Sequence, residues 1–564
     1  MAKKYLIVGG VAGGASVAAK LRRLSEDDHI VMFEKGPHVS FSNCCLPYYL
    51  SGTIETAEDL VLMTPQKFDN QYNIDARVNN EVISIDKENK EVEVKNLLTN
   101  EIYKESYDKL ILSPGAQPIK PNLPGIEKIN SFTIRNVVDI DKLQQSIQSI
   151  KPKHITVVGA GFIGIETVEN LVEAGYKVSL VQSPNQVLKQ FDYDLAQIMH
   201  KELYDKGVEL ILGDRVESFN ENELVLKSGK KISSEVVIFG IGVTPDSILA
   251  KNADLKLGKG NTIWVDHNYK TSDKDIYAVG DAIQVYNPIT RDYGMLALAG
   301  PALKQARAVA MHIHNIPVIY PGYIGSSVVK CFDYNGATTG INEKVAKDMG
   351  LEYECAFIVP KDKVGLMPDS EELHFKLLFE RPTGRILGAQ AIGRGNVDKR
   401  IDVIATAMRA KATIDHLTDL ELCYAPPFGS ARDAVNMAGF VASNLLHDTF
   451  KQKHMSQLRT LHQEGALIID VRERDEYELG HIKGAKLIPL SELRDRLDEI
   501  PKDKEVYLHC RSGQRSYNAV LALQNRGWDK VYNLSGGFIE LCFYEYFRDK
   551  TTPREPIVSN YDFK

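Results

Sequence analysis

The sequence has no apolar run that approaches the roughly 18 residues needed to cross a membrane as a helix. Its first hydrophobic run, residues 5–10, is short and ends in glycines, unlike the core of a signal peptide. A net charge of −7 provides no basic excess for binding nucleic acid. The 7 cysteines lack the spacing of a disulfide framework, as is usual in a reducing compartment. We therefore expect a cytoplasmic protein that binds neither membranes nor nucleic acid.

Spacings typical of metal sites are also missing. The 14 histidines form no His-x3-His pair, and the cysteines form no Cys-x2-Cys pair. We therefore expect no metal centre. Four cysteines have no motif around them and are most simply packed thiols, namely Cys331, Cys355, Cys423 and Cys542.

The clearest pattern in the chain is a repeat. A chain of 564 residues is too long for one hydrophobic core. A buried strand at 5–9 leads through a glycine-rich turn into a helix at 15–24, and the same order returns at 154–174. Residues 271–281 then have the pattern of a return to the first fold. The repeat predicts two nested Rossmann-like dinucleotide-binding folds, one inserted within the other.

The fold class is therefore predicted to be α/β, with several domains. After the two dinucleotide folds, alternating strands and two helices indicate an α+β interface domain, and a compact α/β module follows a polar linker. The predicted boundaries are 1–150 with 268–322 for the first fold, 151–267 for the second, 323–445 for the interface domain, 446–456 for the linker, 457–550 for the last module and 551–564 for the tail.

The two glycine-rich turns favour binding of a pyrophosphate group. A backbone without Cβ atoms can approach a phosphate closely, and the following helix presents unpaired N–H groups. The second turn has the full G-x-G-x-x-G pattern at Gly159, Gly161 and Gly164, whereas Val11 takes the middle-glycine position of the first turn. Either turn alone could be a structural connection between strand and helix. Their occurrence together favours two bound dinucleotides.

The last residue of the second strand in each fold bears on ribose recognition. In the first fold this residue is Glu34, a carboxylate that can accept hydrogen bonds from both ribose hydroxyls. The equivalent residue of the second fold is Gln182, which is neutral and does not repel a 2′-phosphate. The sequence therefore leaves both NADH and NADPH open.

Cys44 is the first candidate nucleophile. It lies in Ser-Phe-Ser-Asn-Cys-Cys-Leu-Pro-Tyr-Tyr at 40–49, where a flavoprotein would place the sulfur that meets its flavin. Dithiol flavoenzymes need a second cysteine at a C-x4-C spacing, and that position is Tyr49. A single redox sulfur must complete its cycle with an external thiol or be oxidised to a sulfenic acid. The alternative is a buried structural thiol.

The neighbours of Cys44 have several interpretations. A helix that starts near Leu46-Pro47 would favour the thiolate of Cys44 through its N-terminus. Asn43 could orient a substrate amide or cap that helix. Cys45 could be a small packed residue, a partner in a transient vicinal disulfide, or a second sulfur carrier.

Cys510 is the second candidate nucleophile, at the end of a predicted strand and just before a helix. The loop from Cys510 to Arg515 has six members, which leaves room for a sulfur atom, whereas cysteine phosphatases have one more residue and hold a phosphate. Backbone N–H groups together with Arg511 and Arg515 would stabilise a thiolate or an anionic persulfide. The alternative, an inactive interaction module, normally lacks the cysteine.

These segments make the chain similar to the coenzyme A disulfide reductases fused to a rhodanese domain. The resemblance rests on Gly-Gly-Val-Ala-Gly-Gly at 9–14, on Ser-Phe-x-Asn-Cys-x-Leu-Pro-Tyr at 40–48 and on the Cys510 loop, and it covers essentially the whole chain. It implies FAD on the first fold, NAD(P)H on the second, a homodimer formed through the interface domain, and a rhodanese-like fold for the last module.

The resemblance also implies particular site residues. The cofactors would contact residues of both folds, namely Gly9, Gly10, Val11, Ala12, Gly13, Glu34, Lys35, Val82, Ser113, Gly115, Arg135, Gly159, Gly161, Ile163, Gly164, Glu166, Gln182, Gly242, Asp281 and Ala302. Coenzyme A would lie beside polar and cationic residues, namely Ser16, Lys20, Arg23, Ser40, Asn43 and Arg432. Tyr424, in a stretch that reaches the partner subunit's active site in such dimers, would donate a proton or hydrogen bond near the sulfur. The expected catalytic residues are Cys44, Tyr424, Cys510, Arg511 and Arg515.

The implied reaction is reduction of coenzyme A disulfide, persulfide or polysulfide at Cys44, with electrons from NAD(P)H through FAD and with sulfane sulfur carried by Cys510. Leu366-Met367-Pro368 stands where many relatives have Tyr-Tyr-Pro, so a tyrosine that would protonate the departing thiolate is missing. This departure favours coenzyme A persulfide or polysulfide as the substrate.

Two alternatives compete with this interpretation. An NADH oxidase or peroxidase would use a sulfenic acid on Cys44, but those enzymes carry a histidine where this sequence has Val11. A redox-sensing protein that docks a partner through its last module would not need an intact Cys510 loop and second glycine turn.

Overall fold

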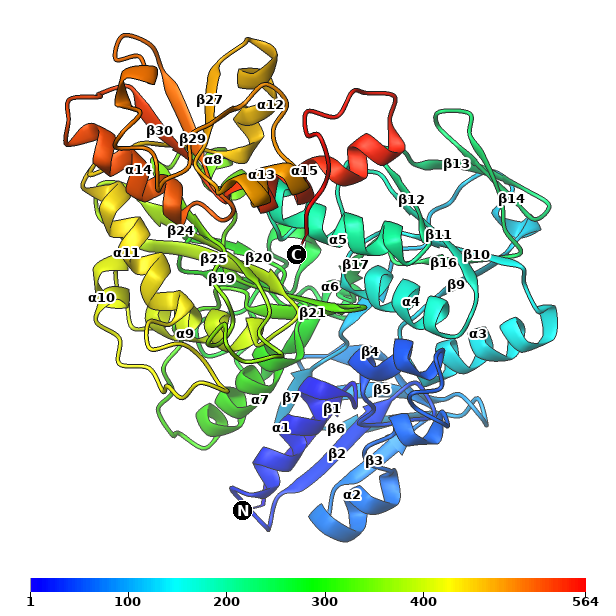
Figure 1. Cartoon of the computed structure of the whole chain (residues 1–564). Coiled ribbons are helices and arrows are strands. Elements are labelled where there is room, and N and C mark those ends of the chain that lie inside the picture. Colours follow the sequence, from blue (N-terminus) through cyan, green and yellow to red (C-terminus); the bar gives the residue numbers. More distant parts are fainter. Residues whose placement is uncertain (1, 564) are drawn as a thin grey trace. The chain divides into compact units, whose positions relative to one another are not determined.

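Both glycine-rich turns connect a buried strand to a helix in the computed structural model, which describes residues 2–563 (Figure 1). In the first repeat, β1 (Lys4–Val8) leads into α1 (Ala12–Arg22) and then into β2 (His29–Glu34). Helix α1 begins earlier than the predicted residue 15, because the small residues after the turn already adopt helical backbone angles and Ala15 donates to the carbonyl of Val11.

The second repeat has the same order. Strand β10 (His154–Val158) leads into α4 (Phe162–Glu173) and β11 (Lys177–Gln182). Each strand pairs in parallel with its successor, β1 with β2 and β10 with β11. Such pairing buries both faces of a strand, which is why the central strands read as continuous apolar runs in the sequence.

The first sheet has the strand order β18-β7-β1-β2-β3, and all its neighbours are parallel. Strand β18 (Ile276–Ala278) lies beside β7 (Lys109–Leu112), so the chain returns to this sheet after the second fold, as predicted. In the second sheet β11, β10, β16 (Val236–Phe239) and β9 (Asn130–Thr133) are successive parallel neighbours.

The structure differs from the predicted boundary at residue 150. Strand β9 precedes that boundary yet belongs to the second sheet, and α3 (Val137–Ile150) connects it to β10. A connection between parallel strands needs such a crossover helix, so β9 and α3 belong with the second fold.

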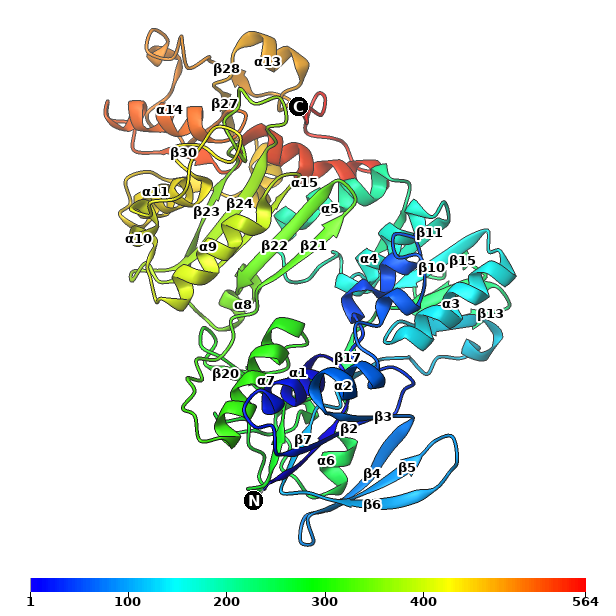
Figure 2. The same cartoon turned by 90° about the horizontal axis from the view of Figure 1, so that it is seen from below.

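An antiparallel sheet follows, with the strand order β21-β22-β25-β24-β23. Its strands are β21 (Ser327–Cys331), β22 (Tyr334–Gly340), β23 (Tyr353–Ile358), β24 (Leu373–Glu380) and β25 (Ile386–Gly393). Helices α9 (Val397–Arg409) and α11 (Ala434–Leu446) pack against this sheet (Figure 2).

The last module contains a parallel sheet with the order β26-β30-β29-β27-β28. Its strands are β26 (Gln452–Lys453), β27 (Leu467–Asp470), β28 (Lys486–Leu487), β29 (Val506–His509) and β30 (Val531–Leu534). Strand β26 lies inside the range predicted as a linker, but its pairing with β30 makes it part of this sheet. In the predicted tail, Ile557 and Val558 are buried, and Val558 pairs with Ile482.

The chain divides into two compact units. The first contains the chain up to Ser183 and Asp214–Tyr323, and the second contains Pro184–Gly213 and the chain from Ile324 onward. Among residues 2–563 no helix has the length and apolar character to span a bilayer.

The other elements of the first unit are β3 (Asp75–Val78), β4 (Asn80–Asp86), β5 (Glu91–Asn96), β6 (Ile102–Ser106), β8 (Ala116–Pro118), β13 (Val216–Asn220), β14 (Glu223–Leu226), β15 (Lys231–Ser233), β17 (Val243–Pro245), β19 (Val285–Asn287), β20 (Asp292–Gly294), α2 (Pro65–Tyr72), α6 (Ile248–Asn252), α7 (Ala299–Ile313) and the 3₁₀ helices η1 (Asn43–Tyr49), η2 (Glu58–Leu60), η3 (Ile126–Lys128), η4 (Lys259–Asn261) and η5 (Gly280–Ala282). Those of the second unit are β12 (Glu209–Leu212), α5 (Tyr193–Asp205), α8 (Glu343–Asp348), α10 (Ile414–Thr418), α12 (Met455–Gln463), α13 (Arg474–Leu479), η6 (Leu497–Glu499), α14 (Gln514–Gln524) and α15 (Gly537–Thr551).

Candidate active site

Candidate cofactor residues of the first fold gather at the carboxyl edge of its parallel sheet. Gly9 follows β1, Glu34 ends β2, Ser113 follows β7 and Asp281 lies just after β18. Ligands of open parallel sheets bind at this edge because the loops that leave neighbouring strands meet there. The fold therefore brings together residues that are far apart in the sequence.

The first glycine turn is closely packed. Gly9 has a φ of +95°, and a Cβ atom on it would lie 2.1 Å from the carbonyl oxygen of Ser113. A Cβ on Gly14 would lie 1.8 Å from the carbonyl oxygen of Gly9. Val11, the residue before α1, provides no side-chain cap, so the first N–H groups of the helix face the turn without an acceptor from that residue. This turn fits the phosphate of a dinucleotide such as FAD.

The carboxylate of Glu34 is fixed by the backbone on both sides. Its Oε2 accepts the N–H of Gly10 at 2.9 Å, and its Oε1 accepts the N–H of Gly36 at 2.8 Å. The neighbouring ammonium group of Lys35 lies 3.5 Å from the Asp246 carboxylate. These two hydrogen bonds orient the Glu34 carboxylate at the end of β2.

Arg135 and Asp281 provide opposite charges near this edge. The guanidinium of Arg135 donates to the side chain of Gln117 and, at 3.2 Å, to the carbonyl of Pro114, next to Gly115. Burial raises the pKa of Asp281, and the charge of Arg135 opposes this rise. A desolvated carboxyl group of this kind is suited to hydrogen-bonding a ligand hydroxyl. Two further candidates, Val82 and Ala302, are buried.

The second glycine turn leaves its backbone open. Gly159 has a φ of +103°, and a Cβ on Gly164 would lie 1.9 Å from the carbonyl oxygen of Gly159. A Cβ on Gly161 would meet nothing within 4 Å, so the backbone there is accessible to a phosphate. Helix α4 begins without a side-chain cap, and Ile163 in its first turn is exposed. These features fit a second dinucleotide.

The remaining candidates of the second fold lie at the strand ends. The Oε1 atom of Gln182 accepts the N–H of Ala160 at 3.1 Å. Gly242, just after β16, has a φ of +117°, and its carbonyl accepts the N–H of Ile119 at 3.0 Å. Both positions therefore lie at the carboxyl edge of the second sheet.

Cys44 is exposed and lies in the first turn of η1. Desolvation raises the pKa of its thiol, and the carboxylates of Glu166 and Asp281 raise it further. The sequence predicts a thiolate favoured by a helix N-terminus, but η1 is a short 3₁₀ helix. The charges of the chain around Cys44 therefore disfavour the thiolate.

Glu166 is the main charged neighbour of this thiol. It lies in the first half of α4, and burial together with the charge of Glu169 raises its pKa to about 7. A carboxyl group with this pKa changes its protonation state near neutral pH. Its ionisation is therefore coupled to that of Cys44.

Tyr49 occupies the position where a dithiol enzyme would have its second cysteine. Burial raises the pKa of this phenol, and the nearby carboxylate of Asp141, which accepts its hydrogen bond, raises it further. Tyr49 therefore provides no sulfur and no acid of ordinary strength to Cys44.

Asn43 does not cap η1. The residue before the helix is Ser42, and the Nδ2 of Asn43 donates to the carbonyl oxygen of Arg135 at 3.2 Å. The capping interpretation of Asn43 is therefore wrong. Cys45 is half-buried beside it, with its N–H donating to the carbonyl of Ser42.

Three of the four cysteines predicted to be packed are buried, namely Cys331, Cys355 and Cys542. The prediction is wrong for Cys423, which is exposed because the stretch around it forms an open loop instead of a core element.

The candidate coenzyme A residues of the first unit lie on α1 and in the loop before η1. Ser16, Lys20 and Arg23 are spaced at i, i+4 and i+7, so they share one face of the helix. The guanidinium of Arg23 lies 5.6 Å from the centre of the Tyr72 ring. Ser40 has a φ of +48°, and its N–H donates to the carbonyl of Gly10 at 2.8 Å.

The second unit presents exposed apolar side chains near the remaining candidates. The exposed fractions are 50% for Tyr424, 66% for Phe428 and 93% for Leu366. The two loops that carry them are joined by a hydrogen bond from the N–H of Val364 to the carbonyl of Gly429. Arg432 is also exposed, 5.5 Å from the ring centre of Phe440.

The sulfur of Cys510 lies in a loop between β29 and α14 and is 1% exposed. It accepts the N–H of Gly513 at 3.1 Å and the hydroxyl of Ser516 at 3.5 Å. The Ser516 hydroxyl has one proton, and the Oδ1 of Asn533 at 2.6 Å competes with the sulfur for it. One backbone donor of the predicted cradle, the N–H of Gly513, faces the sulfur, and Gly513 has a φ of +96°.

The two arginines of this loop have carboxylate partners. Arg515 hydrogen-bonds the Cys510 sulfur and donates twice to Glu476, both at 2.6 Å. Arg511 donates to Asp562 at 3.1 Å and to Glu372 at 3.3 Å. Sequence reasoning missed these three carboxylates, since their distance from the loop along the chain leaves no local signal. Ser516 lies within the loop motif and could have been predicted as a donor.

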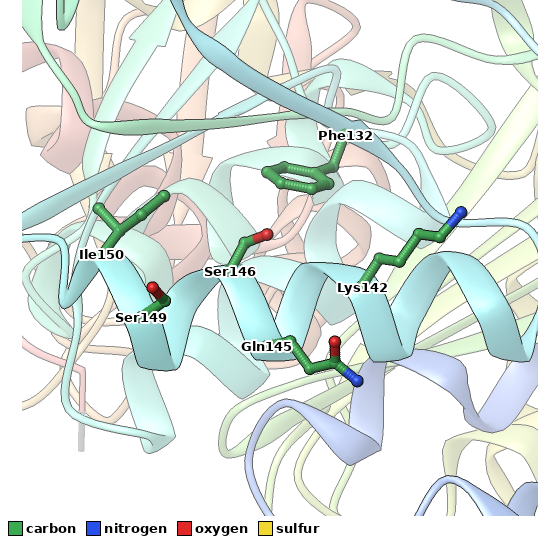
Figure 3. A pocket seen from close by; sticks show the side chains of 6 residues that line it. All are labelled: Phe132, Lys142, Gln145, Ser146, Ser149 and Ile150. Atoms are coloured by element: carbon green, nitrogen blue, oxygen red, sulfur yellow. The ribbon is translucent and has the colours of Figure 1, made fainter.

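A shallow surface hollow lies elsewhere, along α3 (Figure 3). Phe132 from β9 and the α3 residues Lys142, Gln145, Ser146, Ser149 and Ile150 line it. None of the predicted site residues lines it, and it provides no nucleophile or charge pair.

Comparison with known families covers most of the chain. Residues 3–306 match the pyridine nucleotide-disulphide oxidoreductases, residues 326–435 match the dimerisation domain of these oxidoreductases, and residues 454–542 match the rhodanese-like domain. Coenzyme A disulfide reductase of Staphylococcus aureus (strain JH9) is 35% identical over 440 residues, which are 78% of this chain and 99% of the relative.

Solved structures extend the similarity to the last module. Reduced Bacillus anthracis CoADR-RHD is 46% identical with a TM-score of 0.94, covering 97% of this chain and 99% of the other. A NAD-dependent persulfide reductase from A. fulgidus is 33% identical with a TM-score of 0.90, covering 95% and 99%. A water-forming NADH oxidase from Lactobacillus brevis is 26% identical with a TM-score of 0.76, covering 79% and 100%. The predicted fold class and resemblance are confirmed.

Proposed function

The chain belongs to the pyridine nucleotide-disulphide oxidoreductase family, and we propose that it uses NAD(P)H to reduce coenzyme A disulfide or coenzyme A persulfide at Cys44. One observation carries the proposal. Cys44 has Tyr49, hydrogen-bonded to Asp141, where a dithiol enzyme needs a second cysteine. Cys44 therefore forms its disulfide with a small external thiol and not with a cysteine at the C-x4-C position.

The family implies FAD and NAD(P)H. FAD would lie at the carboxyl edge of the first sheet, held by the turn at 9–13 with Glu34, Ser113, Arg135 and Asp281, and there it would pass electrons from NAD(P)H to the Cys44 sulfur. NAD(P)H would lie on the open turn at 159–164, beside Glu166 and Gln182. We infer that both nicotinamide cofactors are accepted, because Gln182 carries no charge.

Cys44 performs the sulfur chemistry. Its thiolate attacks one sulfur of coenzyme A disulfide, the S–S bond breaks, and one coenzyme A leaves as a thiolate that takes up a proton. The other coenzyme A remains on Cys44 as a mixed disulfide, which two electrons and one proton convert into the Cys44 thiolate and a second coenzyme A thiol. With coenzyme A persulfide, attack on the inner sulfur releases hydrosulfide and leaves the same mixed disulfide.

Coenzyme A would be bound by cations on one face of α1. Lys20 and Arg23 would meet its phosphates, with Ser16 on the same face, and Ser40 and Asn43 would lie near its thiol end. Arg432 is a further coenzyme A contact that the family resemblance implies.

We propose that a homodimer completes the site around Cys44. The match to a dimerisation domain and the exposed side chains of Leu366, Tyr424 and Phe428 support it. Tyr424 of the partner subunit would then donate a hydrogen bond near Cys44. The free state of all 7 cysteines is consistent with a cytoplasmic location.

Cys510 would carry sulfane sulfur to or from coenzyme A. The N–H of Gly513 stabilises negative charge on its sulfur or on a persulfide attached to it. Coenzyme A, as a diffusing carrier, would connect this reaction with Cys44.

The test is oxidation of NADH and of NADPH by the purified protein, with coenzyme A disulfide and with coenzyme A persulfide. Cys44→Ser should abolish reduction while the absorbance of bound FAD is retained. Retained turnover in that variant would reject the proposal. A disulfide within the chain at Cys44 in the resting protein, found by mass spectrometry without any coenzyme A or sulfur adduct, would also reject it. Oxygen or peroxide consumption faster than reduction of either coenzyme A substrate would favour the NADH oxidase alternative.

A further inference from the structure

The arginines around Cys510 are already neutralised by the fold. Both terminal nitrogens of Arg515 donate to Glu476 on α13, at 2.6 Å each. Such a bidentate pair fixes the plane of the guanidinium group and uses its two strongest donor positions. Arg515 can therefore orient a sulfur atom, but its positive charge is balanced by Glu476.

The positive charge of Arg511 faces two carboxylates. It lies 3.1 Å from the carboxylate of Asp562, in the chain that follows α15, and 3.3 Å from that of Glu372, next to β24. Glu372 also faces Lys361 at 3.9 Å. The loop cation is thus held between two acidic groups that the loop sequence does not contain.

The third arginine is buried with its own partner. Arg472 and Asp470 are both 0% exposed and lie 2.7 Å apart. Burial lowers the pKa of the adjacent His509 and so disfavours its charged form, while the charge of Asp470 opposes this shift. Four cations of this region, Arg472, Arg511, Arg515 and Lys361, each face a carboxylate, and these carboxylates are Asp470, Asp562, Glu476 and Glu372. Within residues 2–563 the arginines of the Cys510 loop are therefore charge-compensated.

We propose that this compensation makes Cys510 selective for sulfane sulfur bound to an organic thiol and unreactive toward thiosulfate. Thiosulfate is a dianion, and a buried thiolate can accept it only beside cations that are free to pair with its sulfonate oxygens. The reacting end of an organic persulfide carries at most one charge. Glu476, Asp562 and Glu372 act as specificity-determining residues through Arg515 and Arg511. The inference deepens the proposed function, on which it rests for the role of Cys510 as a sulfur carrier.

The transfer needs no external oxidant or reductant. The Cys510 thiolate attacks the terminal sulfur of R–S–SH, the S–S bond of the donor breaks, and R–S⁻ leaves and takes the proton. Cys510 is left as a persulfide. The coenzyme A thiolate then attacks the outer sulfur of that persulfide, which forms coenzyme A persulfide and restores the Cys510 thiolate.

The experiment measures sulfur transfer to cyanide from thiosulfate and from glutathione persulfide, with the rate of Cys510→Ser subtracted as background. The full-length wild-type protein should show a kcat/KM for glutathione persulfide about 100-fold or more above that for thiosulfate. Asp562→Asn and Glu476→Gln should each shift this ratio toward thiosulfate by about tenfold, because each frees part of an arginine's charge. Glu478→Gln removes an exposed charge from the same helix α13 and should leave the ratio unchanged.

The inference is overturned if the wild-type protein uses thiosulfate as well as it uses glutathione persulfide. It is also overturned if the folded variants keep the wild-type ratio. If Glu476→Gln does not fold, Asp562→Asn alone decides, since Asp562 lies outside the helices and strands of the module. Reduction of coenzyme A disulfide by NAD(P)H, measured on the same preparation, reports on the proposed function separately, because that reaction uses Cys44 and does not involve Cys510.

Discussion

The side-chain oxygen of Gln182 accepts the backbone N–H of Ala160 at 3.1 Å. In the first fold the carboxylate of Glu34 accepts the N–H of Gly10 in the same way, at 2.9 Å. Each of these side chains ends the second strand of its fold, so the two positions differ by one charge and little in geometry. That difference in charge should decide whether the second fold accepts the 2′-phosphate of NADPH.

Gln182→Glu should therefore lower kcat/KM for NADPH relative to NADH by about tenfold or more, since the new carboxylate repels the 2′-phosphate. Initial rates with coenzyme A disulfide under each nicotinamide measure the ratio. Gln66→Glu adds the same charge on α2 of the first fold and serves as the control. An unchanged ratio in Gln182→Glu would show that residue 182 does not approach the ribose.

The coupling between Glu166 and Cys44 leads to a second prediction. The charge of Glu166 raises the pKa of the Cys44 thiol, so Glu166→Gln should lower that pKa and increase the thiolate fraction at neutral pH. The rate of Cys44 alkylation by iodoacetamide against pH, followed by mass spectrometry, measures the shift. Glu173→Gln, exposed at the other end of α4, is the matched control. A profile in Glu166→Gln that matches wild type would contradict the coupling.

The raised pKa of Glu166 also predicts that the stability of the fold depends on pH. Folding raises the pKa of this carboxyl from 4.5 to about 7, so the folded state binds its proton more tightly than the unfolded state. This stabilisation is fully present below pH 4.5 and is lost as the pH rises through about 7. Glu166→Gln should remove about 2 kcal/mol of the decrease in unfolding free energy between pH 5 and pH 8. Urea unfolding at the two pH values measures it, and an equal decrease in variant and wild type would exclude a raised pKa.

Local patterns predicted the nested folds well, because strand–glycine turn–helix units are encoded by neighbouring residues. The positions of Glu34 and Gln182 at their strand ends follow from the same units. The local pattern places β9 in the first fold, whereas the structure pairs it with β16 of the second, a segment about a hundred residues later in the chain.

The ion-pair partners of the Cys510 loop could not be predicted from the sequence. The loop itself is recognisable, but Arg515 pairs with a residue 39 positions earlier and Arg511 with one 51 positions later. Such pairs arise from tertiary packing of α13 and of the C-terminal segment, for which the sequence carries no periodic signal. The same holds for Asn43, whose partner Arg135 lies 92 positions away.

Cys45 provides a fourth prediction. It is half-buried within η1, its N–H donates to the carbonyl of Ser42, and it is one of 7 cysteines that form no disulfide in the structure. Cys45→Ser should therefore change kcat for coenzyme A disulfide by no more than about twofold. Steady-state rates, with Cys44→Ser as the inactive reference, measure this. Loss of activity in Cys45→Ser would instead support a vicinal disulfide or a second sulfur carrier.

The last prediction concerns the buried ion cluster of the second unit. Lys376 on β24 is 2% exposed and lies 3.2 Å from Asp192 and 2.7 Å from Asp194, with Glu343 as a third partner. Lys376→Met should lower the unfolding free energy by about 3 kcal/mol or more, since it leaves partly buried carboxylates without their cation. The loss should be larger at pH 8 than at pH 5, because protonation of the carboxylates relieves their repulsion at the lower pH. Urea unfolding followed by circular dichroism measures both effects. Lys344→Met removes an exposed i,i+4 pair with Asp348 and should change stability little, so equal losses in the two variants would show that the cluster is not the cause.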